Sequence, residues 1–377
     1  MAESFLRPQW TRGQVSRQAH VGLPEGTYEE EHGRHAFKGR ASHLYRTHPP
    51  TAWVRLEGDI KPRAFDLNRL TTADQLQPAA PWERILWNGD VAIYVSRLSE
   101  PMPHFLRDAD GDVCYFVHRG EGILETDYGP LKFRTGDYLL IPKGTTHRLV
   151  PETGDNFFYV IEGRAEFQLP DRGILGRHAL FDPAILEAPE PDPHDENGEF
   201  VVKVKRDGRY ITLVYPFHPL DVVGWKGDLC PLRLNVADFR PVVSPRYHLP
   251  PSVHVTWQCD GFEIGTFAPR PTETGDPTAL RVPFYHSNID NDEVLFYHRG
   301  QFFSRAGIGE GFITHHPQGL HHGPQAAAIE ASKTKEFADE YAVMVETERP
   351  LQVERAALAV EIEGYATSWA RGLKLVP

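Results

Sequence analysis

Cysteine and long apolar runs are both scarce in this chain. Its three cysteines, Cys114, Cys230 and Cys259, are scattered over 377 residues, which excludes a disulfide framework and a cysteine-based zinc site. The longest apolar runs, such as 91–95 and 138–141, are far too short to cross a bilayer. No signal-like segment opens the sequence, so we expect a cytoplasmic protein that is not embedded in a membrane.

Positive charge is also in deficit. The chain has 40 Lys and Arg residues and 52 Asp and Glu residues, which gives a net charge of -12. This charge argues against nucleic acid or an anionic membrane as the main partner. Glycine, proline and histidine are plentiful instead, with 32, 32 and 19 copies. These counts indicate many turns between short strands and an unusual supply of imidazole.

Short β-rich runs separated by turns dominate the chain and predict an all-β sandwich or barrel architecture. Helical patterns are few, with short candidates at 181–187, 326–332 and 366–371. The stretch 187–199 is acidic, rich in proline and without periodicity, which is typical of a linker. We therefore expect one domain at 1–186 and a second at 200–377.

An internal repeat lies on either side of this linker. Residues 112–120 read DVCYFVHRG and residues 292–300 read DEVLFYHRG. After each, a second element of the form G-x5-P-x-G-x2-H follows, at 136–147 and 311–322. Two linked elements in the same order indicate two copies of one supersecondary unit.

The second copy contains two histidines and one carboxylate spaced like metal ligands: His286, Glu293 and His322. Two neutral imidazoles and a carboxylate leave several positions of an octahedral metal open, the arrangement that non-haem Fe(II) oxygenases use. In the first copy the carboxylate position is Val113, and only His147 remains of the set. We therefore expect the metal site in the second copy and a structural role for the first.

The two spacings, H-x-N-x4-E-x6-G and G-x5-P-x-G-x2-H, resemble the two motifs of the cupin family, which are small jelly-roll barrels. The resemblance implies a bicupin, an all-β fold of two barrels with a few short helices. In this interpretation the N-terminal barrel has lost its metal site, and the C-terminal barrel carries it.

Five segments in one order resemble the homogentisate 1,2-dioxygenase family; they lie at 44–46, 162–171, 217–225, 283–288 and 322–324. The resemblance implies an Fe(II) enzyme, with Mn(II) as an alternative ion. Such an enzyme opens the ring of homogentisate or a related para-dihydroxylated aromatic acid with dioxygen, in tyrosine and phenylalanine catabolism. It also implies a homo-oligomer, either a trimer or a hexamer.

The resemblance places the metal on His286, Glu293 and His322. Asp292 is a competing carboxylate, because the family usually has its glutamate one residue nearer to the first histidine. His248 falls where the family keeps an acid–base histidine, a role that suits an imidazole near neutral pH. The alternative for His248 is an ordinary surface histidine before a Pro-Pro turn.

We expect further residues to line the substrate site beside His322: Asn288, His316, Tyr285 and Phe302. On a strand, Asn288 would share the face of His286. Phe302 stands where the family has a tyrosine, which removes one hydrogen bond to the substrate and leaves the identity of the aromatic acid open.

Arg299 and Arg305 are the candidate partners for a substrate carboxylate, although arginines on barrel strands are commonly solvated. Two other functions remain open at this point. One is a different cupin enzyme, such as a gentisate-type or aminophenol-type dioxygenase or a metal-dependent isomerase. The other is a non-catalytic bicupin that binds a small molecule.

Overall fold

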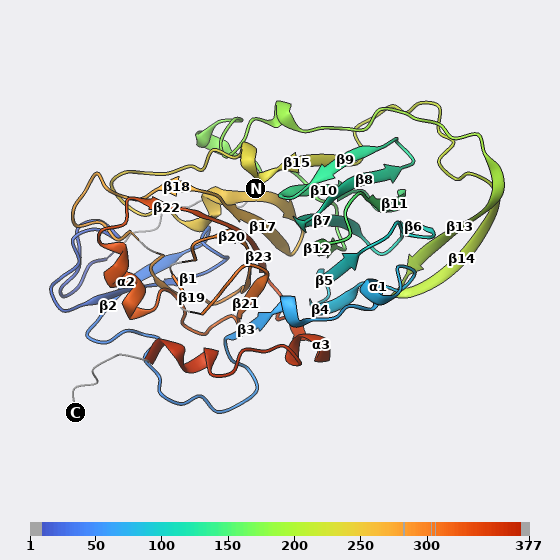
Figure 1. Ribbon diagram of the computed structural model, residues 1–377. Coiled ribbons are helices and arrows are strands. Elements are labelled where there is room, and N and C mark those ends of the chain that lie inside the picture. The colour runs from blue at the N-terminus through green and yellow to red at the C-terminus, as the bar shows by residue number, and fades with distance from the viewer. Residues whose placement is uncertain (1–9, 282, 303, 306, 371–377) are drawn as a thin grey trace.

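The computed structural model describes residues 10–281, 283–302, 304–305 and 307–370 (Figure 1). Strands dominate these residues, as the sequence predicts, and no helix among them is long and apolar enough to cross a membrane. The α-helices are short: α1 (Ala73–Leu76), α2 (Ala326–Ser332) and α3 (Arg355–Leu358). Single 3-10 turns are η1 (Leu67–Arg69), η2 (Gly173–Leu175), η3 (Pro183–Ile185), η4 (Val236–Asp238), η5 (Pro251–His254) and η6 (Tyr365–Ala370).

Of the three expected helices, 326–332 is confirmed as an α-helix. The other two candidates, 181–187 and 366–371, contain only the 3-10 turns η3 and η6 within the described residues. The reason for η3 is local. Asp182 accepts a hydrogen bond from the backbone N–H of Ala184 and Pro183 occupies the first turn, so the segment has a cap but too few residues to continue as an α-helix.

Two sheets form the first barrel, the right-hand half of Figure 1. The larger sheet runs in the order β15 (Leu232–Asn235), β10 (Asp137–Ile141), β7 (Asp112–Arg119), β12 (Asn156–Gly163), β5 (Val91–Leu98), β4 (Glu83–Trp87), β24 (Gln352–Val353). The second runs β14 (Arg209–Phe217), β13 (Asn197–Arg206), β6 (Phe105–Asp108), β11 (Thr146–Pro151), β8 (Glu121–Thr126), β9 (Leu131–Arg134).

The second barrel occupies the left-hand half of Figure 1. Its main sheet has the order β16 (Val255–Cys259), β17 (Phe262–Phe267), β23 (Glu340–Thr347), β20 (Asp292–Gly300), β21 (Phe312–His316), β3 (Arg63–Asp66). A three-stranded sheet of β19 (Tyr285–Asn288), β1 (Tyr28–Gly33) and β2 (Ala41–Arg46) and a short ladder of β18 (Arg270–Pro271) and β22 (Phe337–Ala338) complete it.

The large sheet of the first barrel is buried on both faces, so its strands are continuously apolar rather than alternating with polar residues. On β7 and β12, Tyr115 and Phe158 point into the core of their own barrel. Phe116 and Tyr159, one residue along each strand, point the other way and join a core shared with the second barrel.

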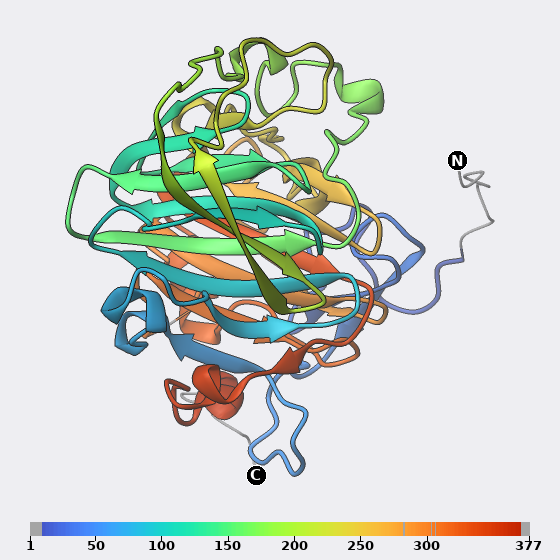
Figure 2. The same ribbon diagram turned by 90° about the vertical axis from the view of Figure 1, so that its right-hand side faces the viewer.

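The main sheet of the second barrel packs against this outer face. In Figure 2 the strands of the second barrel lie behind those of the first. The ring of Phe296 on β20 stacks on that of Tyr159 with a centroid separation of 4.5 Å. Full burial of one such side chain contributes about 1.5–3 kcal/mol, so the shared core joins the two barrels firmly. On β20 the alternate residues, Glu293 among them, therefore face the interior of the second barrel.

Strand pairing crosses the boundary that we expected at 187–199. β13 and β14, assigned to the second domain, belong to a sheet of the first barrel, where β13 lies parallel to β6. Conversely, β1 and β3 complete the second barrel by pairing with β19 and β21. The division at 187–199 does not coincide with the division of the sheets, because composition marks a loop but does not reveal which strands pair at long range.

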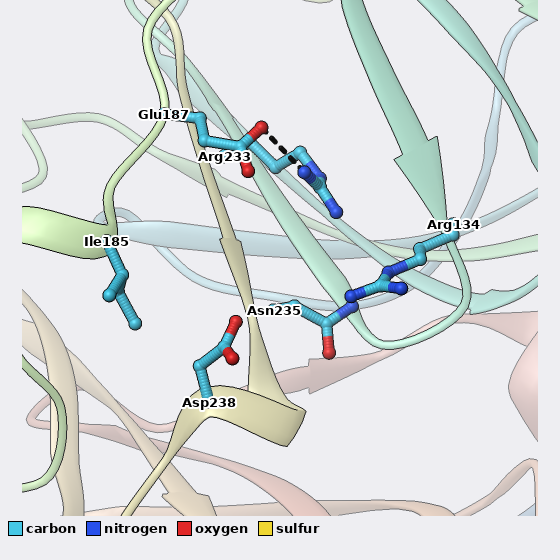
Figure 3. A pocket seen from close by; sticks show the side chains of 6 residues that line it. All are labelled: Arg134, Ile185, Glu187, Arg233, Asn235 and Asp238. Carbon is cyan, nitrogen blue, oxygen red and sulfur yellow. Dashed lines mark hydrogen bonds and ion pairs between the residues drawn. The ribbon is translucent and has the colours of Figure 1, made fainter.

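The acidic segment runs over the surface of the first barrel, where Glu187 and Arg233 exchange backbone hydrogen bonds. A hollow of about 300 Å³ lies at this crossing. Figure 3 shows side chains that line it, with that of Glu187 turned toward Arg233. Arg233 donates to Glu187 at 2.6 Å and to Asp137 at 2.7 Å. Its charge is satisfied by these carboxylates, so we regard the hollow as part of the packing of this segment.

Candidate metal centre

The three predicted metal ligands lie together inside the second barrel. Ligand atoms of His286, Glu293 and His322 are within 4.8 Å of one another, and all three residues are buried. His286 comes from β19 and Glu293 from β20, while His322 follows β21. Two backbone hydrogen bonds of 2.9 Å join His286 and His322 and hold their rings side by side.

Each imidazole is oriented by a backbone carbonyl. Nδ1 of His286 donates to the carbonyl of Phe284 at 3.1 Å, and Nδ1 of His322 donates to that of Leu320 at 3.0 Å. The lone pairs are therefore on the Nε2 atoms, each 3.6 Å from an oxygen of Glu293. Both Nε2 atoms are buried without a hydrogen-bond partner in the described chain. Unpaired buried polar atoms are costly, and a cation between them would remove that cost.

Glu293 is held in its ionised form. Burial works to raise its pKa, but the adjacent imidazoles of His322, His286 and His316 hold that pKa well below its usual value. Nδ1 of His316 donates to Oε1 of Glu293 at 2.8 Å, and Nε2 of His316 accepts from the hydroxyl of Tyr365 at 3.0 Å. His316, expected beside the substrate, is therefore placed behind the carboxylate as its support.

Asp292, the competing carboxylate, faces away from this cluster. It accepts from Nε2 of His315 at 2.8 Å and from the backbone N–H groups of Gln318 and Leu351 at 2.9 Å each. Successive side chains of a strand point to opposite faces, so only one of the two acidic neighbours can enter the barrel. The geometry favours Glu293 as the ligand.

The corresponding histidine of the first barrel is satisfied without a metal. His147 has the same relation to the chain as His322, because its Nδ1 lies 3.3 Å from the carbonyl two residues earlier, that of Thr145. Its Nε2, however, lies 3.2 Å from the hydroxyl of Tyr115. A phenol therefore occupies the position that stays open in the second barrel.

Val113 fills the carboxylate position of the first barrel and packs in its apolar core. His104 lies close enough to affect His147. Burial lowers the pKa of His147 to about 4, and the charge of His104 contributes to the lowering. The first barrel thus retains two histidines, with Val113 in place of the carboxylate.

His248 lies near the centre but does not contact the ligands. Its Nδ1 is 2.8 Å from Oε1 of Glu273, which fixes the ring and leaves Nε2 free for a proton. The ring of Phe284 neighbours both imidazoles, 5.9 Å from that of His248 and 5.6 Å from that of His286. Glu273 was not found from the sequence, because nothing local distinguishes it from the other acidic residues of the chain.

The other residues expected in the pocket do not all point toward the candidate ligands. Asn288 shares the face of His286, and its amide oxygen and nitrogen are buried and unpaired within the described residues. Tyr285 points the other way, where its ring meets that of Tyr28 edge-on at 6.3 Å. It is therefore not brought to the ligands. Phe302 is buried, with its ring 4.9 Å from that of Tyr297.

Two further ionisable groups lie close to Glu293. Arg305 is 7% exposed, its Nε has no hydrogen-bond partner in the described chain, and its guanidinium lies 5.6 Å from the ring of Trp369. Glu346 lies opposite Glu293 on β23, with both oxygens buried and unpaired among the described residues. Burial, together with the charge of Glu293, raises the pKa of Glu346 to about 8, so it is mainly a neutral acid at pH 7.

Comparison with known proteins relates the chain to dioxygenases. Residues 71–236 match the family model for the homogentisate 1,2-dioxygenase N-terminal region. The chain is 34% identical over 379 residues to the "Putative dioxygenase SSO1533" of Saccharolobus solfataricus, with 95% of this chain and 98% of that protein covered.

Solved cupin structures are more distant. A cupin 2 conserved barrel domain protein from Leptotrichia buccalis is 12% identical, with 76% of this chain and 96% of that chain covered and a TM-score of 0.36. A point mutant of Bacillus subtilis oxalate decarboxylase is 12% identical, with 79% of this chain and 80% of that chain covered and a TM-score of 0.34.

Proposed function

Because this chain belongs to the homogentisate 1,2-dioxygenase family, we propose that it is a non-haem Fe(II) enzyme that opens the ring of homogentisate or a closely related para-dihydroxylated aromatic acid. One observation carries the proposal. The buried, unpaired Nε2 atoms of His286 and His322 face the ionised carboxylate of Glu293 within the described residues. This donor set suits Fe(II), with Mn(II) as the alternative ion.

His286, Glu293 and His322 would hold the metal. When bound, Fe(II) supplies positions for a phenolate oxygen and dioxygen and the electron transfer between them. The chain's own contribution is to fix the three ligands before substrate arrives. The carbonyls of Phe284 and Leu320 orient the two imidazoles, and His316 orients the carboxylate.

His248 is the proposed base for the substrate hydroxyl. Its ring is fixed through Nδ1 by Glu273, so Nε2 is the atom that would take the proton. The ring of Phe284 neighbours both His248 and His286, so a substrate that reaches both histidines would pack against it.

Arg305 is the proposed partner of the substrate carboxylate. A buried guanidinium with an unpaired N–H binds a carboxylate strongly, because the pair is charged and shielded from water. The unpaired amide of Asn288 is available to a second polar group of the substrate. Phe302, which replaces the family's tyrosine, offers no such donor, so we expect the acid group to depend on Arg305.

Oxygen uptake with a panel of substrates tests the proposal. The metal-free protein is loaded with Fe(II) under anaerobic conditions and then exposed to ¹⁸O₂ with homogentisate, gentisate, 2-aminophenol or hydroquinone. We expect uptake with homogentisate and a ring-opened product that contains two ¹⁸O atoms. Uptake with gentisate or aminophenol alone would identify a different cupin dioxygenase. Recovery of every compound unchanged, without oxygen uptake, would refute the dioxygenase proposal and favour a binding protein.

We also propose, from the family resemblance, that the enzyme is a cytoplasmic trimer or hexamer. Light scattering coupled to size-exclusion chromatography measures the oligomeric state directly. A monomer at micromolar concentration would contradict this part of the proposal.

A further inference from the structure

A second set of two histidines and a carboxylate lies outside the proposed iron site. Ligand atoms of His20, Glu31 and His43 are within 4.8 Å of one another. Glu31 on β1 and His43 on β2 are directly paired across the hairpin, and His20 comes from the segment before it. Glu31 is also in register with His286 on the other side of β1. The set therefore lies on the same small sheet as one of the proposed iron ligands.

The carboxylate of Glu31 is the common point of this cluster. Its Oε2 lies 3.9 Å from Nε2 of His20 and 3.8 Å from Nε2 of His43, distances too long for hydrogen bonds. Glu31 is only 9% exposed, and the two histidines are the groups that lie nearest to its Oε2 among the printed ion pairs of the described residues. A largely buried carboxylate is unfavourable without a counter-charge, and a cation between the three groups would supply one.

The separations are close to those expected around a metal ion. Atoms about 2.1 Å from one ion lie about 3.4 Å apart when the geometry is tetrahedral. The matching distances in the proposed iron site are 3.6 Å. A shift of a few tenths of an ångström would therefore bring Glu31 and both histidines to bonding distance.

Glu29 orients His20 as a supporting carboxylate does in metal sites. Oε2 of Glu29 lies 2.9 Å from Nδ1 of His20 and accepts from the backbone N–H of His20 at 2.8 Å, while its Oε1 accepts from the hydroxyl of Tyr45 at 2.8 Å. With Nδ1 donating, the lone pair of His20 is on Nε2, which faces Glu31. The His20 ring also stacks on Phe284 at 4.1 Å, which limits its rotation.

His43 faces Glu31 through Nε2, and its Nδ1 is buried and has no hydrogen-bond partner in the described part of the chain. Its side chain is 26% exposed, which leaves a path for an ion from solvent.

We propose that His20, Glu31 and His43 form a second metal site, which binds a divalent transition ion such as Zn²⁺ and ties the N-terminal segment to the β1–β2 hairpin. Three protein ligands leave a fourth position for water. The site does not depend on the proposed ring-cleaving function. Because β1 pairs with β19, an ion here also fixes the strand that carries His286.

Zinc stoichiometry of the metal-free full-length protein tests this site. We expect two equivalents in the unaltered chain, one in Glu31→Gln and one in His286→Ala, measured by equilibrium dialysis and elemental analysis. Glu29→Gln should keep the second equivalent but bind it about 10- to 100-fold more weakly. His48→Ala, at an exposed histidine just beyond β2, is the matched control and should bind two equivalents.

Thermal melting gives an independent readout. Zn²⁺ should raise the melting temperature of His286→Ala, in which the proposed iron site is lost, and this rise should disappear when Glu31→Gln is added. If Glu31→Gln does not fold, His43→Ala at a partly exposed position replaces it. A single equivalent in the unaltered chain, or two equivalents in both Glu31→Gln and His43→Ala, would overturn the proposal.

Discussion

Nδ1 of His118 lies 2.9 Å from Nδ1 of His298, and the two residues occupy the same position in the two repeats. His118 is on β7 and His298 on β20, and both are buried where the barrels meet. One ring has to donate while the other accepts, so the accepting ring must be neutral. Burial lowers the pKa of His118 to about 2 and that of His298 to about 3, and the charges of Arg119 and Arg299 contribute to the lowering at His118 and His298 respectively.

This contact predicts a loss of stability in acid. An unfolded histidine titrates near pH 6.5, whereas these two stay neutral in the folded protein, so the unfolded chain binds more protons below that pH. Each histidine then costs about 1.4 kcal/mol of unfolding free energy for every pH unit below about 6.5. Urea midpoints measured between pH 7.5 and 5 should fall accordingly.

His118→Gln separates this pair from other acid-sensitive groups. Gln can still donate to His298 but does not titrate. The unfolding free energy should therefore fall less steeply below pH 6.5, and the difference in slope should equal about the contribution of one histidine. Replacement of the exposed His48 by Gln is the control and should leave the slope unchanged. An unchanged slope in His118→Gln would show that the pair does not resist protonation.

Replacement of Glu293 by Ala should abolish iron loading and turnover together. The carboxylate is the only acidic group that reaches both unpaired Nε2 atoms in the described cluster, at 3.6 Å from each. Iron per chain after anaerobic loading is measured beside oxygen uptake. Asp292→Asn is the matched control and should keep its iron, because Asp292 faces His315 instead. Iron retained by Glu293→Ala would contradict the assignment of Glu293 as a metal ligand.

The grouping of the three candidate ligands and the repeat were predictable from sequence because both are local patterns. His286, Glu293 and His322 follow a spacing set by one hairpin and its neighbours, and Val113 marked the copy that lacks a carboxylate. The choice between Asp292 and Glu293 was not fixed by composition, since both are acidic. It depends on which face of β20 enters the barrel, and pairing with β23 and packing on the first barrel decide that.

Long-range pairing explains what the sequence did not reveal. The N-terminal β1 pairs with β19, and β13 pairs with β6, although no local sequence pattern indicates these pairings. Glu273 and Glu346 became visible only when other elements placed them beside His248 and Glu293. Such residues have no motif of their own, because their roles come from neighbours distant in the chain.

His316→Gln should weaken iron binding without removing any ligand. The ring supports Glu293 through a 2.8 Å hydrogen bond, and loss of such a support costs about 10- to 100-fold in metal affinity. Competition with a chelator of known affinity measures the change. His315→Gln, altered on the opposite face of the same strand, should affect stability but not iron affinity. Equal iron affinity in His316→Gln and the unaltered protein would contradict this role.

Arg305→Gln should raise the KM for the aromatic acid far more than it lowers kcat. A charged hydrogen bond contributes about 1.5–3 kcal/mol, which corresponds to a rise of about 10- to 100-fold. Arg299→Gln is the control, because that side chain lies over Tyr341 on an exposed part of β20 and should leave KM unchanged. Hydroquinone, which has no carboxylate, distinguishes binding from general damage: its turnover should be equal in both variants. A KM for homogentisate that stays constant in Arg305→Gln would show that another group binds the carboxylate.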